Sequence, residues 1–228
     1  AIPPGPFGYQ VPYASGSGSD TLIFNYVIQE GHNANDLSYS SSSALSLNGG
    51  SIKDSYTNAA NLSLPAPGES GSLSANKNIV IDTSDPVIVI TATNVSNENI
   101  PSTSLTNDTP LNLTITASEP ISGFDQSDIA VSGSATLSEF SATSSTVFTA
   151  KLTPNADEKL TINIPENAAK DVAGNANSAA NEFELTYDGT APAVTIRALN
   201  FAGNAIASGD TTSDDSLKLI FSSTEKFF

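Results

Sequence analysis

The pentapeptide Asp-Thr-Ser-Asp-Pro at 82–86 recurs in this sequence as Asp-Gly-Thr-Ala-Pro at 188–192, 106 positions further along. We refer to these stretches as the first seam and the second seam. The same offset continues without a gap over these pairs: Ile100 and Ile206, Ser102 and Ser208, Asp108 and Asp214, Leu111 and Leu217, Leu113 and Leu219, Ile115 and Phe221, Glu119 and Glu225. Self-similarity at a fixed offset, with Asp and Pro at each seam, predicts a tandem array of domains joined by short linkers.

The complete repeat, residues 86–191, predicts an all-β module. Apolar residues alternate along several short segments that are separated by turn-rich loops. The expected strands are Val87–Thr93, Leu111–Ala117, Ser127–Ser132, Ala135–Phe140, Thr146–Thr153, Lys159–Ile164 and Glu182–Tyr187. Seven short strands in a domain of this size are typical of an immunoglobulin-like (Ig-like) β-sandwich, here without the Cys pair. The predicted fold class is therefore all-β, with tandem Ig-like β-sandwich modules.

The flanking residues predict parts of the same fold. Residues 1–85 are expected to form an Ig-like module that is incomplete at its N-terminal side, and residues 192–228 the opening strands of a further module. The expected strands are Thr21–Gln29, a short one near Ala44, 60–64, 77–82, Val194–Ala198 and Leu217–Ser222. A tight turn is expected at 48–50, and one helical turn at most at 168–170.

Composition limits the classes of function. The 228 residues include 24 acidic and 8 basic ones, and the net charge of −16 argues against binding nucleic acid or anionic membrane through a basic face. It suits a salty, cation-rich medium in which carboxylates are screened or bind Ca²⁺. Cys is absent, which excludes disulfides and zinc–thiolate sites. No apolar run is long enough to insert into a membrane.

Several motifs lie in the loops of the complete module: Ala-Ser-Glu-Pro-Ile-Ser-Gly-Phe at 117–124, Ser-Asp-Ile-Ala-Val at 127–131, and Lys-Asp-Val-Ala-Gly-Asn at 170–175. Together with the second seam, they resemble the bacterial Ig-like tandem repeats of large secreted or cell-surface adhesins. Residues 17–22 and 45–54 resemble a sister subtype, from which the turn at 56–58 departs. The resemblance implies secreted stalk or adhesin repeats, in a family often stiffened by Ca²⁺ at the seams.

Acidic residues near the seams are candidate Ca²⁺ ligands. In an Ig-like sandwich, the loop after the second strand and the loop before the last one lie at the pole where the preceding linker arrives. The acids expected there are Asp82, Asp85, Glu119, Asp125 and Asp171, with Asp188 and Glu225 as counterparts at the second seam. Ca²⁺ takes six to eight oxygen ligands at roughly 2.3–2.6 Å. The alternative is that these acids are solvated and that Asp188 stabilises a turn.

An enzyme is not expected. His32 is the only histidine and lies in a polar Gly-His-Asn loop, where a surface position is expected. Without Cys, Cys–His chemistry is excluded, and a Ser–His–Asp triad would have to use His32 without any nucleophile-elbow motif. The acidic pair at 214–215 lies between expected strands and is interpreted as solvated rather than as a glycosidase pair.

The predicted function is structural: a stalk, filament shaft or adhesin spacer at the cell surface or outside the cell, in adhesion or biofilm attachment. The alternative is a carbohydrate- or surface-binding module appended to a secreted hydrolase. Sugar platforms usually need exposed Trp or Tyr, but Trp is absent and the tyrosines are scattered. The expected partners are neighbouring copies or adjacent modules of a longer chain, and a surface receptor or glycan.

Incomplete sandwiches leave strand edges and core faces open, and strands of another chain can complete them. One hypothesis is therefore that residues 192–228 pack against the incomplete first module of a neighbouring subunit, which builds a head-to-tail filament. The alternative is that the missing strands belong to further residues of a longer chain.

Overall fold

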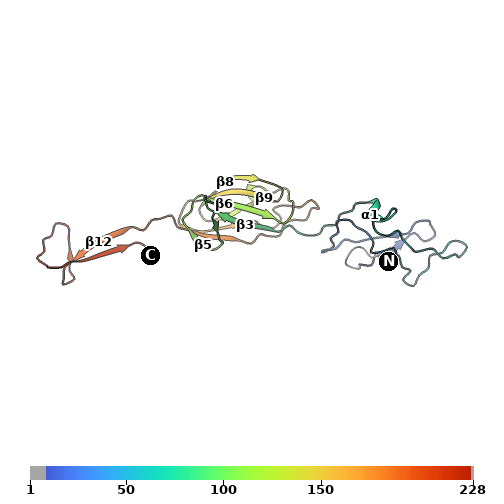
Figure 1. The fold of residues 1–228 in the computed structure, drawn as a ribbon, viewed down its shortest axis with the longest axis horizontal. Helices are drawn as coiled ribbons and strands as arrows, with labels where there is room; N and C mark the ends of the chain where they lie inside the picture. The colour runs from blue at the N-terminus through green and yellow to red at the C-terminus, as the bar shows by residue number, and fades with distance from the viewer. Residues whose placement is uncertain (1–8, 227–228) are drawn as a thin grey trace.

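The computed structural model describes residues 9–226, and a two-sheet β-sandwich of residues 86–191 forms its centre. Figure 1 shows this sandwich between residues 9–85 on one side and residues 192–226 on the other, so that the three parts follow one another in a line. Within the described residues the helical segments are short, namely α1 (Leu73–Asn76) and the 3₁₀ turn η1 (Gln126–Asp128). None of these helices is long and apolar enough to cross a membrane. The predicted all-β class is confirmed.

The sandwich has a five-stranded and a four-stranded sheet. The five-stranded sheet has the order β4-β3-β6-β9-β8, and its strands are antiparallel. Its strands are β3 (Ile88–Thr93), β4 (Asn99–Ile100), β6 (Leu111–Ala117), β8 (Ala135–Ala142) and β9 (Val147–Pro154). The four-stranded sheet has the order β5-β11-β10-β7. Its strands are β5 (Ser104–Thr106), β7 (Ala130–Ser132), β10 (Glu158–Asn163) and β11 (Phe183–Tyr187).

Alternation along the strands builds the core between the two sheets. Leu111, Leu113 and Ile115 on β6 are fully buried, while the residues between them are partly exposed. Leu160 and Ile162 on β10 are fully buried from the opposite sheet. Side chains at every second position of a strand lie on one face, so this sequence pattern specifies the burial directly.

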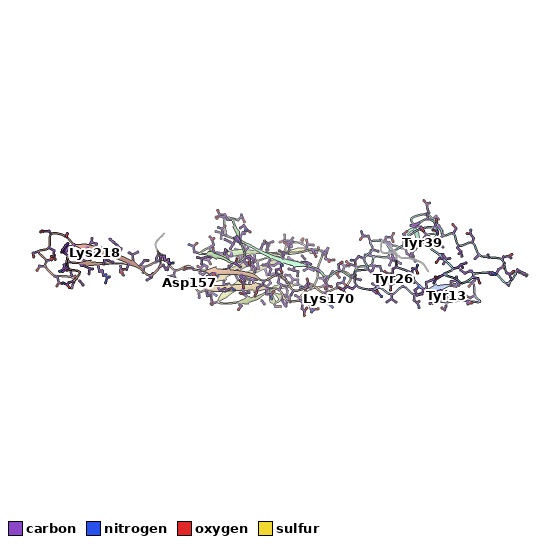
Figure 2. All side chains as sticks on the ribbon, turned by 90° about the horizontal axis from the view of Figure 1, so that it is seen from below. Tyr13, Tyr26, Tyr39, Asp157, Lys170 and Lys218 are labelled. Atoms are coloured by element: carbon purple, nitrogen blue, oxygen red, sulfur yellow. The ribbon has the colours of Figure 1, made fainter. Side chains whose placement is uncertain are left out.

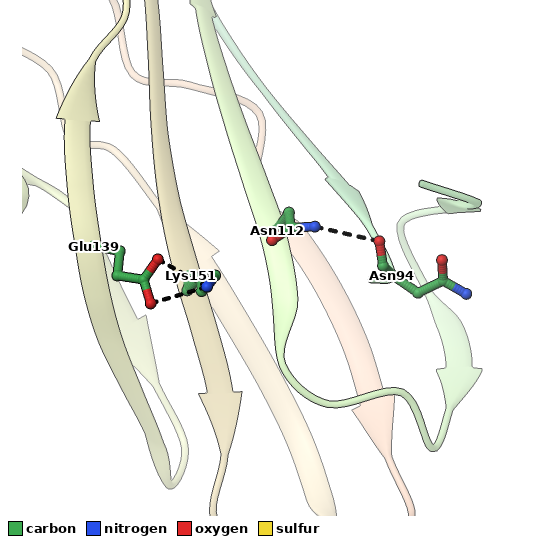
Figure 3. A network of polar contacts seen from close by, with 4 residues as sticks. All are labelled: Asn94, Asn112, Glu139 and Lys151. Atoms are coloured by element: carbon green, nitrogen blue, oxygen red, sulfur yellow. Dashed lines mark hydrogen bonds and ion pairs between the residues drawn. The ribbon is translucent and has the colours of Figure 1, made fainter. Parts of the chain in front are cut away.

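The outer face of the five-stranded sheet carries polar contacts, which Figure 3 shows. Lys151 on β9 forms an ion pair with Glu139 on β8 at 2.8 Å, and the Asn112 side-chain amide donates to the Asn94 carbonyl at 3.3 Å. Because the pair of charges is exposed, it contributes little to stability. Lys151 and Glu139 therefore keep one face of the sheet hydrated while the other face packs.

Most expected strands of the sandwich lie within two residues of the observed ones, but there are three differences. The strand expected at Ser127–Ser132 is shortened to β7, because Asp125 caps the η1 turn over 126–128. The short strands β4 and β5 were not expected. Residues 168–170 form no helical turn; instead Lys170 bridges to Ser122 and to Ala176.

Residues 9–85 contain little regular structure. A two-stranded sheet pairs β1 (Tyr13–Ser15) with β2 (Ile23–Phe24), and isolated bridges join Ala34 to Ile81 and Lys53 to Ala59. The strand expected at 21–29 is thus reduced to β2, and those expected near residue 44, at 60–64 and at 77–82 are not formed. The expected turn at 48–50 is present, with positive φ at Asn48 and Gly49. The division into modules at 85 and 191 stays a prediction.

Residues 192–226 form a three-stranded sheet of order β13-β12-β14. The strands are β12 (Val194–Leu199), β13 (Ala205–Ile206) and β14 (Lys218–Ser223). Ile196 lies opposite Phe221 in this sheet, as Ile90 lies opposite Ile115 between β3 and β6. The register of the sheet therefore equals that of β4-β3-β6, shifted by the 106-residue offset.

Candidate functional site

Three carboxylates meet where the first seam enters the sandwich. Asp82 precedes β3, Glu119 lies in the loop after β6, and Asp171 lies in the loop between β10 and β11. One oxygen of each lies within 4.8 Å of the others. Asp171 is buried, and Asp82 and Glu119 are half-buried. Figure 2 shows Lys170, the neighbour of Asp171, at the end of the sandwich that faces residues 9–85, the pole expected for this cluster.

A tight turn fixes Asp171. Its Oδ1 accepts hydrogen bonds from the backbone amides of Gly174 at 2.6 Å and Asn175 at 2.9 Å. Its Oδ2 accepts one from the Asn175 side-chain amide at 2.8 Å. The same amide of Asn175 also donates to the Asp82 carbonyl at 3.2 Å, which ties the turn to the first seam.

The loop around this turn is closed by Asn177, a polar side chain with 2% exposure. Its Oδ1 accepts a hydrogen bond from the Ala169 amide at 2.7 Å. Its Nδ2 donates to the carbonyls of Pro165 at 3.0 Å and Ser178 at 2.8 Å. A buried amide group whose donor and acceptor atoms both find partners specifies one loop conformation. Asn177 therefore holds the loop that carries Asp171.

Glu119 and Asp171 differ in how readily they ionise. Burial raises the pKa of Glu119, and the nearby charges of Asp82 and Asp171 raise it further. Burial also raises the pKa of Asp171, but hydrogen bonds from Asn175 and from backbone amides of the turn outweigh it, so that the pKa is lowered. At neutral pH the three like charges therefore repel one another, and a bound cation would relieve that repulsion.

The cluster has the chemistry of a site for a hard cation. All its donor atoms are carboxylate oxygens, which Ca²⁺ and Mg²⁺ prefer. Among the described residues it is the sole group of three or more His, Asp or Glu side chains that could share an ion. Of the seven acids predicted as ligands, the structure brings Asp82, Glu119 and Asp171 together; whether they hold Ca²⁺ stays a prediction.

The other four predicted ligands lie outside this group. The Asp125 carboxylate instead accepts hydrogen bonds from the amide and hydroxyl of Ser127, which lower its pKa. Asp85 is exposed. At the second seam, Asp188 accepts a hydrogen bond from the Thr190 amide at 3.3 Å, which is the turn contact of the alternative interpretation. Glu225 is exposed.

The seams have a second feature, which the sequence did not predict. At each seam, a side chain from an earlier part of the chain forms hydrogen bonds with the linker and holds the linker in place. At the first seam, Asn33 Oδ1 accepts a hydrogen bond from the Thr83 amide at 2.7 Å, and Asn33 Nδ2 donates to the Ser84 hydroxyl at 2.8 Å. At the second seam, Asp157 accepts hydrogen bonds from the Gly189 amide at 2.7 Å and from the Thr190 hydroxyl. We call these contacts the linker clamps.

The linker clamps occupy corresponding places in the chain. Thr83 and Gly189, and Ser84 and Thr190, are pairs related by the 106-residue offset. The residue that follows each clamp side chain also forms an antiparallel pair at a corresponding position. Ala34 pairs with Ile81, and Glu158 pairs with Tyr187, which is related to Ile81 by the same offset. Figure 2 shows Asp157 at the end of the sandwich where the second linker leaves. The sequence signal that could have identified the clamp residues is an Asn or Asp directly before a short extended segment.

His32 packs within an aromatic cluster rather than lying free on the surface. Its ring centroid is 4.9 Å from that of Tyr9 and 5.6 Å from that of Tyr26, and the Tyr26 hydroxyl is 2.8 Å from Nδ1. Tyr39 donates to the Pro65 carbonyl at 2.6 Å. Tyr9, Tyr26 and Tyr39 are thus engaged in local packing or hydrogen bonding, whereas Tyr56 is 84% exposed. That the protein is not an enzyme stays a prediction.

Comparisons with known proteins bear on the sandwich. The family model described as bacterial Ig-like domain matches residues 82–187. No curated protein matches the chain. Among solved structures, the N-terminal part of the bacterial S-layer protein SbsC matches with 16% identity and a TM-score of 0.28, over 63% of this chain. The chain spans 42% of that structure. On the family match and the two-sheet fold, residues 82–187 are a bacterial Ig-like domain.

Proposed function

We propose that the chain is a structural segment of a secreted or cell-surface protein, an extended shaft or adhesin spacer in which Ig-like units follow one another along a line. The linker clamps carry this proposal. A flexible connection between domains needs no such contact, whereas Asn33 and Asp157 each fix two successive linker residues. A repeated contact that restricts a linker favours a defined direction from one unit to the next.

The acidic cluster supports the same role, as a site for Ca²⁺ at the first seam. The cluster joins the linker residue Asp82 to two loops of the sandwich, through Glu119 and Asp171. An ion shared by these carboxylates would cross-link the linker to the domain. It would also offset the burial and the repulsion from Asp82 and Asp171 that together raise the pKa of Glu119. The chain would then be stiffest in a medium that contains Ca²⁺.

Linker stiffness is measured with two spin labels that flank the second seam. Because the chain has no Cys, Val95→Cys and Phe201→Cys introduce unique labels at positions with 65% and 87% exposure. We expect a narrow distance distribution between the labels, which broadens in Asp157→Ala. Asp157→Asn is the matched control, because Asn33 holds the first seam with the same kind of contact. A broad distribution in the protein without the Asp157 change would refute a stiff shaft.

Calcium binding is measured by thermal unfolding of the chain in Ca²⁺, Mg²⁺ and EDTA. An ion that binds only the native state at about a hundredfold excess over its Kd stabilises it by about 2.7 kcal/mol. We expect a higher Tm in Ca²⁺ that Glu119→Gln abolishes and that Asp125→Asn, outside the cluster, retains. An unchanged Tm in Ca²⁺ would leave the linker clamps as the source of stiffness and exclude the metal site.

A further inference from the structure

The chain contains a single Asn-Gly pair, Asn48–Gly49, and a single Asp-Gly pair, Asp188–Gly189. Both pairs have the same chemical weakness in the main chain. The backbone nitrogen of the glycine lies close to the side-chain carbonyl carbon of the preceding residue, and glycine has no Cβ that hinders its approach. When that nitrogen attacks the side chain, a cyclic imide, a succinimide, forms in the backbone. The surroundings of the two glycine amides therefore decide which pair reacts.

The Asn-Gly pair occupies the tip of an exposed turn. The Gly50 amide donates to the Leu47 carbonyl at 2.8 Å, and the φ angles of Asn48 and Gly49 are 44° and 83°. Positive φ at both central residues is the pattern of a type I′ turn, for which Asn-Gly is a preferred pair. Asn48 and Gly49 are both exposed, so water reaches the reacting atoms.

The reacting groups of this turn are not held by other contacts. Among residues 9–226, neither the Asn48 side chain nor the Gly49 amide forms a hydrogen bond. A Cβ placed on Gly49 would meet no atom within 4 Å, so the space around its main chain is open. Within the described residues, the flanking segments 45–47 and 50–52 belong to no strand. The turn can therefore open locally without breaking a sheet, and local openings of this kind cost little free energy.

The central sandwich has an exposed turn at the equivalent place. Asp54 and Asp171 hold matching turns, in which each accepts hydrogen bonds from a backbone amide and from the side chain of the same Asn. Counted back equally from these two residues, 48–49 correspond to 165–166. Residues 165–166 are exposed in a sandwich whose two sheets are complete. The exposure of 48–49 is thus a property of this turn in the fold.

The Asp-Gly pair is held in place. The Gly189 amide donates to the Asp157 carboxylate at 2.7 Å, as part of the linker clamp at the second seam. The Asp188 carboxylate accepts a hydrogen bond from the Thr190 amide at 3.3 Å, so it lies against the residue beyond the glycine. A Cβ placed on Gly189 would overlap the Tyr187 hydroxyl, so this glycine is also enclosed. These contacts keep the Gly189 nitrogen away from the Asp188 side chain.

We infer that Asn48 is a site of spontaneous deamidation, and that the linker clamp at Asp157 protects Asp188–Gly189 from the corresponding isomerisation. At Asn48, a bond forms between the Gly49 nitrogen and Cγ, and the bond between Cγ and Nδ2 breaks. Nδ2 leaves as ammonia, together with the hydrogen of the Gly49 amide. Water then opens the succinimide, which gives aspartate when the new bond breaks and isoaspartate when the original peptide bond breaks. At Asp188, the same ring would form with loss of water. Neither reaction changes an oxidation state.

Deamidation changes the turn in two ways. It adds a negative charge to a chain whose net charge is already −16. Isoaspartate also inserts an additional methylene group into the main chain, and it removes the Asn-Gly pair that the type I′ conformation prefers. The modification therefore accumulates in residues 9–85 and spares the linker that leaves the sandwich at the second seam.

Peptide mapping by mass spectrometry tests the reaction at Asn48. The full chain is incubated at neutral pH for increasing times. We expect the peptide that contains Asn48 to gain the mass difference between an acid and an amide, and a methyltransferase specific for isoaspartate to label it. Asn61 is the internal control, because it is exposed in the same part of the chain but precedes Leu62, and it should stay unchanged. Gly49→Ala, which hinders the nitrogen, and Asn48→Gln, which would need a larger ring, should each lose the mass shift.

The variant Asp157→Ala tests the protection of Asp188. Over the period in which Asn48 reacts, we expect no isoaspartate at Asp188 in the unchanged chain and a clear signal in Asp157→Ala. Asp157→Asn is the matched control, because it keeps an acceptor for the Gly189 amide and should still protect. Since Asp157→Ala also removes the contact with the Thr190 hydroxyl, the unchanged chain is incubated in urea as well, where the clamp is lost and Asp188 should react.

Two sets of results would overturn the inference. An Asn48 side chain that stays intact, or that reacts no faster than Asn61, would contradict the reactivity of the turn. Isoaspartate at Asp188 in the folded unchanged chain at the level found in urea, or none in both Asp157→Ala and urea, would contradict the protection. Neither readout depends on the distance between spin labels or on the Tm in Ca²⁺, so this inference and the proposed function fail separately.

Discussion

Asn177→Ala is expected to destabilise the central sandwich strongly, because Asn177 is a buried side chain whose polar atoms are all hydrogen-bonded. The substitution removes an acceptor from the Ala169 amide, at a residue with 3% exposure, and donors from the carbonyls of Pro165 and Ser178. A net hydrogen bond contributes about 1 kcal/mol, and a buried group left without a partner costs about 1–3 kcal/mol. Three such losses predict a reduction of about 3 kcal/mol in the free energy of unfolding.

Urea and thermal unfolding measure this change. For a domain of this size, about 3 kcal/mol corresponds to a Tm lower by roughly 15 °C, with the dependence on urea concentration unchanged. The matched control is Asn163→Ala on β10, because the buried Oδ1 of Asn163 has no hydrogen-bond partner. We expect this control to cost less than about 1 kcal/mol. Equal effects of the two substitutions would refute the reasoning that hydrogen bonds of Asn177, and not its volume, hold the loop.

Four further substitutions, one of them with a control, have defined outcomes. Leu113→Ala should lower the free energy of unfolding in urea by about 3 kcal/mol, because Leu113 is fully buried. Leu219→Ala, at the equivalent but 55% exposed position, should leave the Tm of a dilute sample unchanged. Equal effects of the two substitutions would contradict the difference in burial. Gly133→Ala should cost about 1–3 kcal/mol, since φ is +99° and a Cβ would lie 2.6 Å from the Leu160 side chain and 2.9 Å from the Lys159 carbonyl. The pKa of Glu119 is raised in the fold, so ionisation of this carboxyl lowers the stability of the fold as the pH rises above the ordinary glutamate pKa of 4.5. Glu119→Gln should therefore raise the Tm in EDTA at neutral pH but not at pH 4. Asp171, whose pKa is lowered, acts in the opposite direction, and Asp171→Asn should lower the neutral-pH Tm relative to that at acid pH.

Alternation predicted most strands of the sandwich because their partners lie within the same domain. Leu111–Ala117 was predicted with its observed bounds, since its apolar positions all face one core. The same alternation over 21–29 predicted a strand of which two residues are formed, β2. A strand needs a neighbour to hydrogen-bond and a surface to cover, and the alternation of its side chains specifies neither.

The cluster of acids was predictable in part. Topology placed Asp82, Glu119 and Asp171 at one pole, and the structure brings them together. Asp125 was predicted there as well, but hydrogen bonds within its own turn hold its carboxylate at the start of η1. The same carboxylate can either cap its own turn or join a cluster with residues from distant loops, and the spacing of residues in the sequence does not decide between the two. The linker clamps escaped prediction because they join residues about fifty and about thirty positions apart.

The parallel pairing of β5 with β11 has a consequence for a molecule pulled from its two ends. The second linker leaves directly from β11, and Ser104, Leu105 and Thr106 on β5 pair with Leu185, Thr186 and Tyr187. Tension along the chain loads this pair lengthwise, so its hydrogen bonds resist in shear and share the load instead of opening one after another. The rate of forced unfolding, rather than the equilibrium stability, then decides how long each unit survives under tension. The pairing of three residues on β5 with three residues on β11 is therefore the contact that has to break before the domain unfolds under tension.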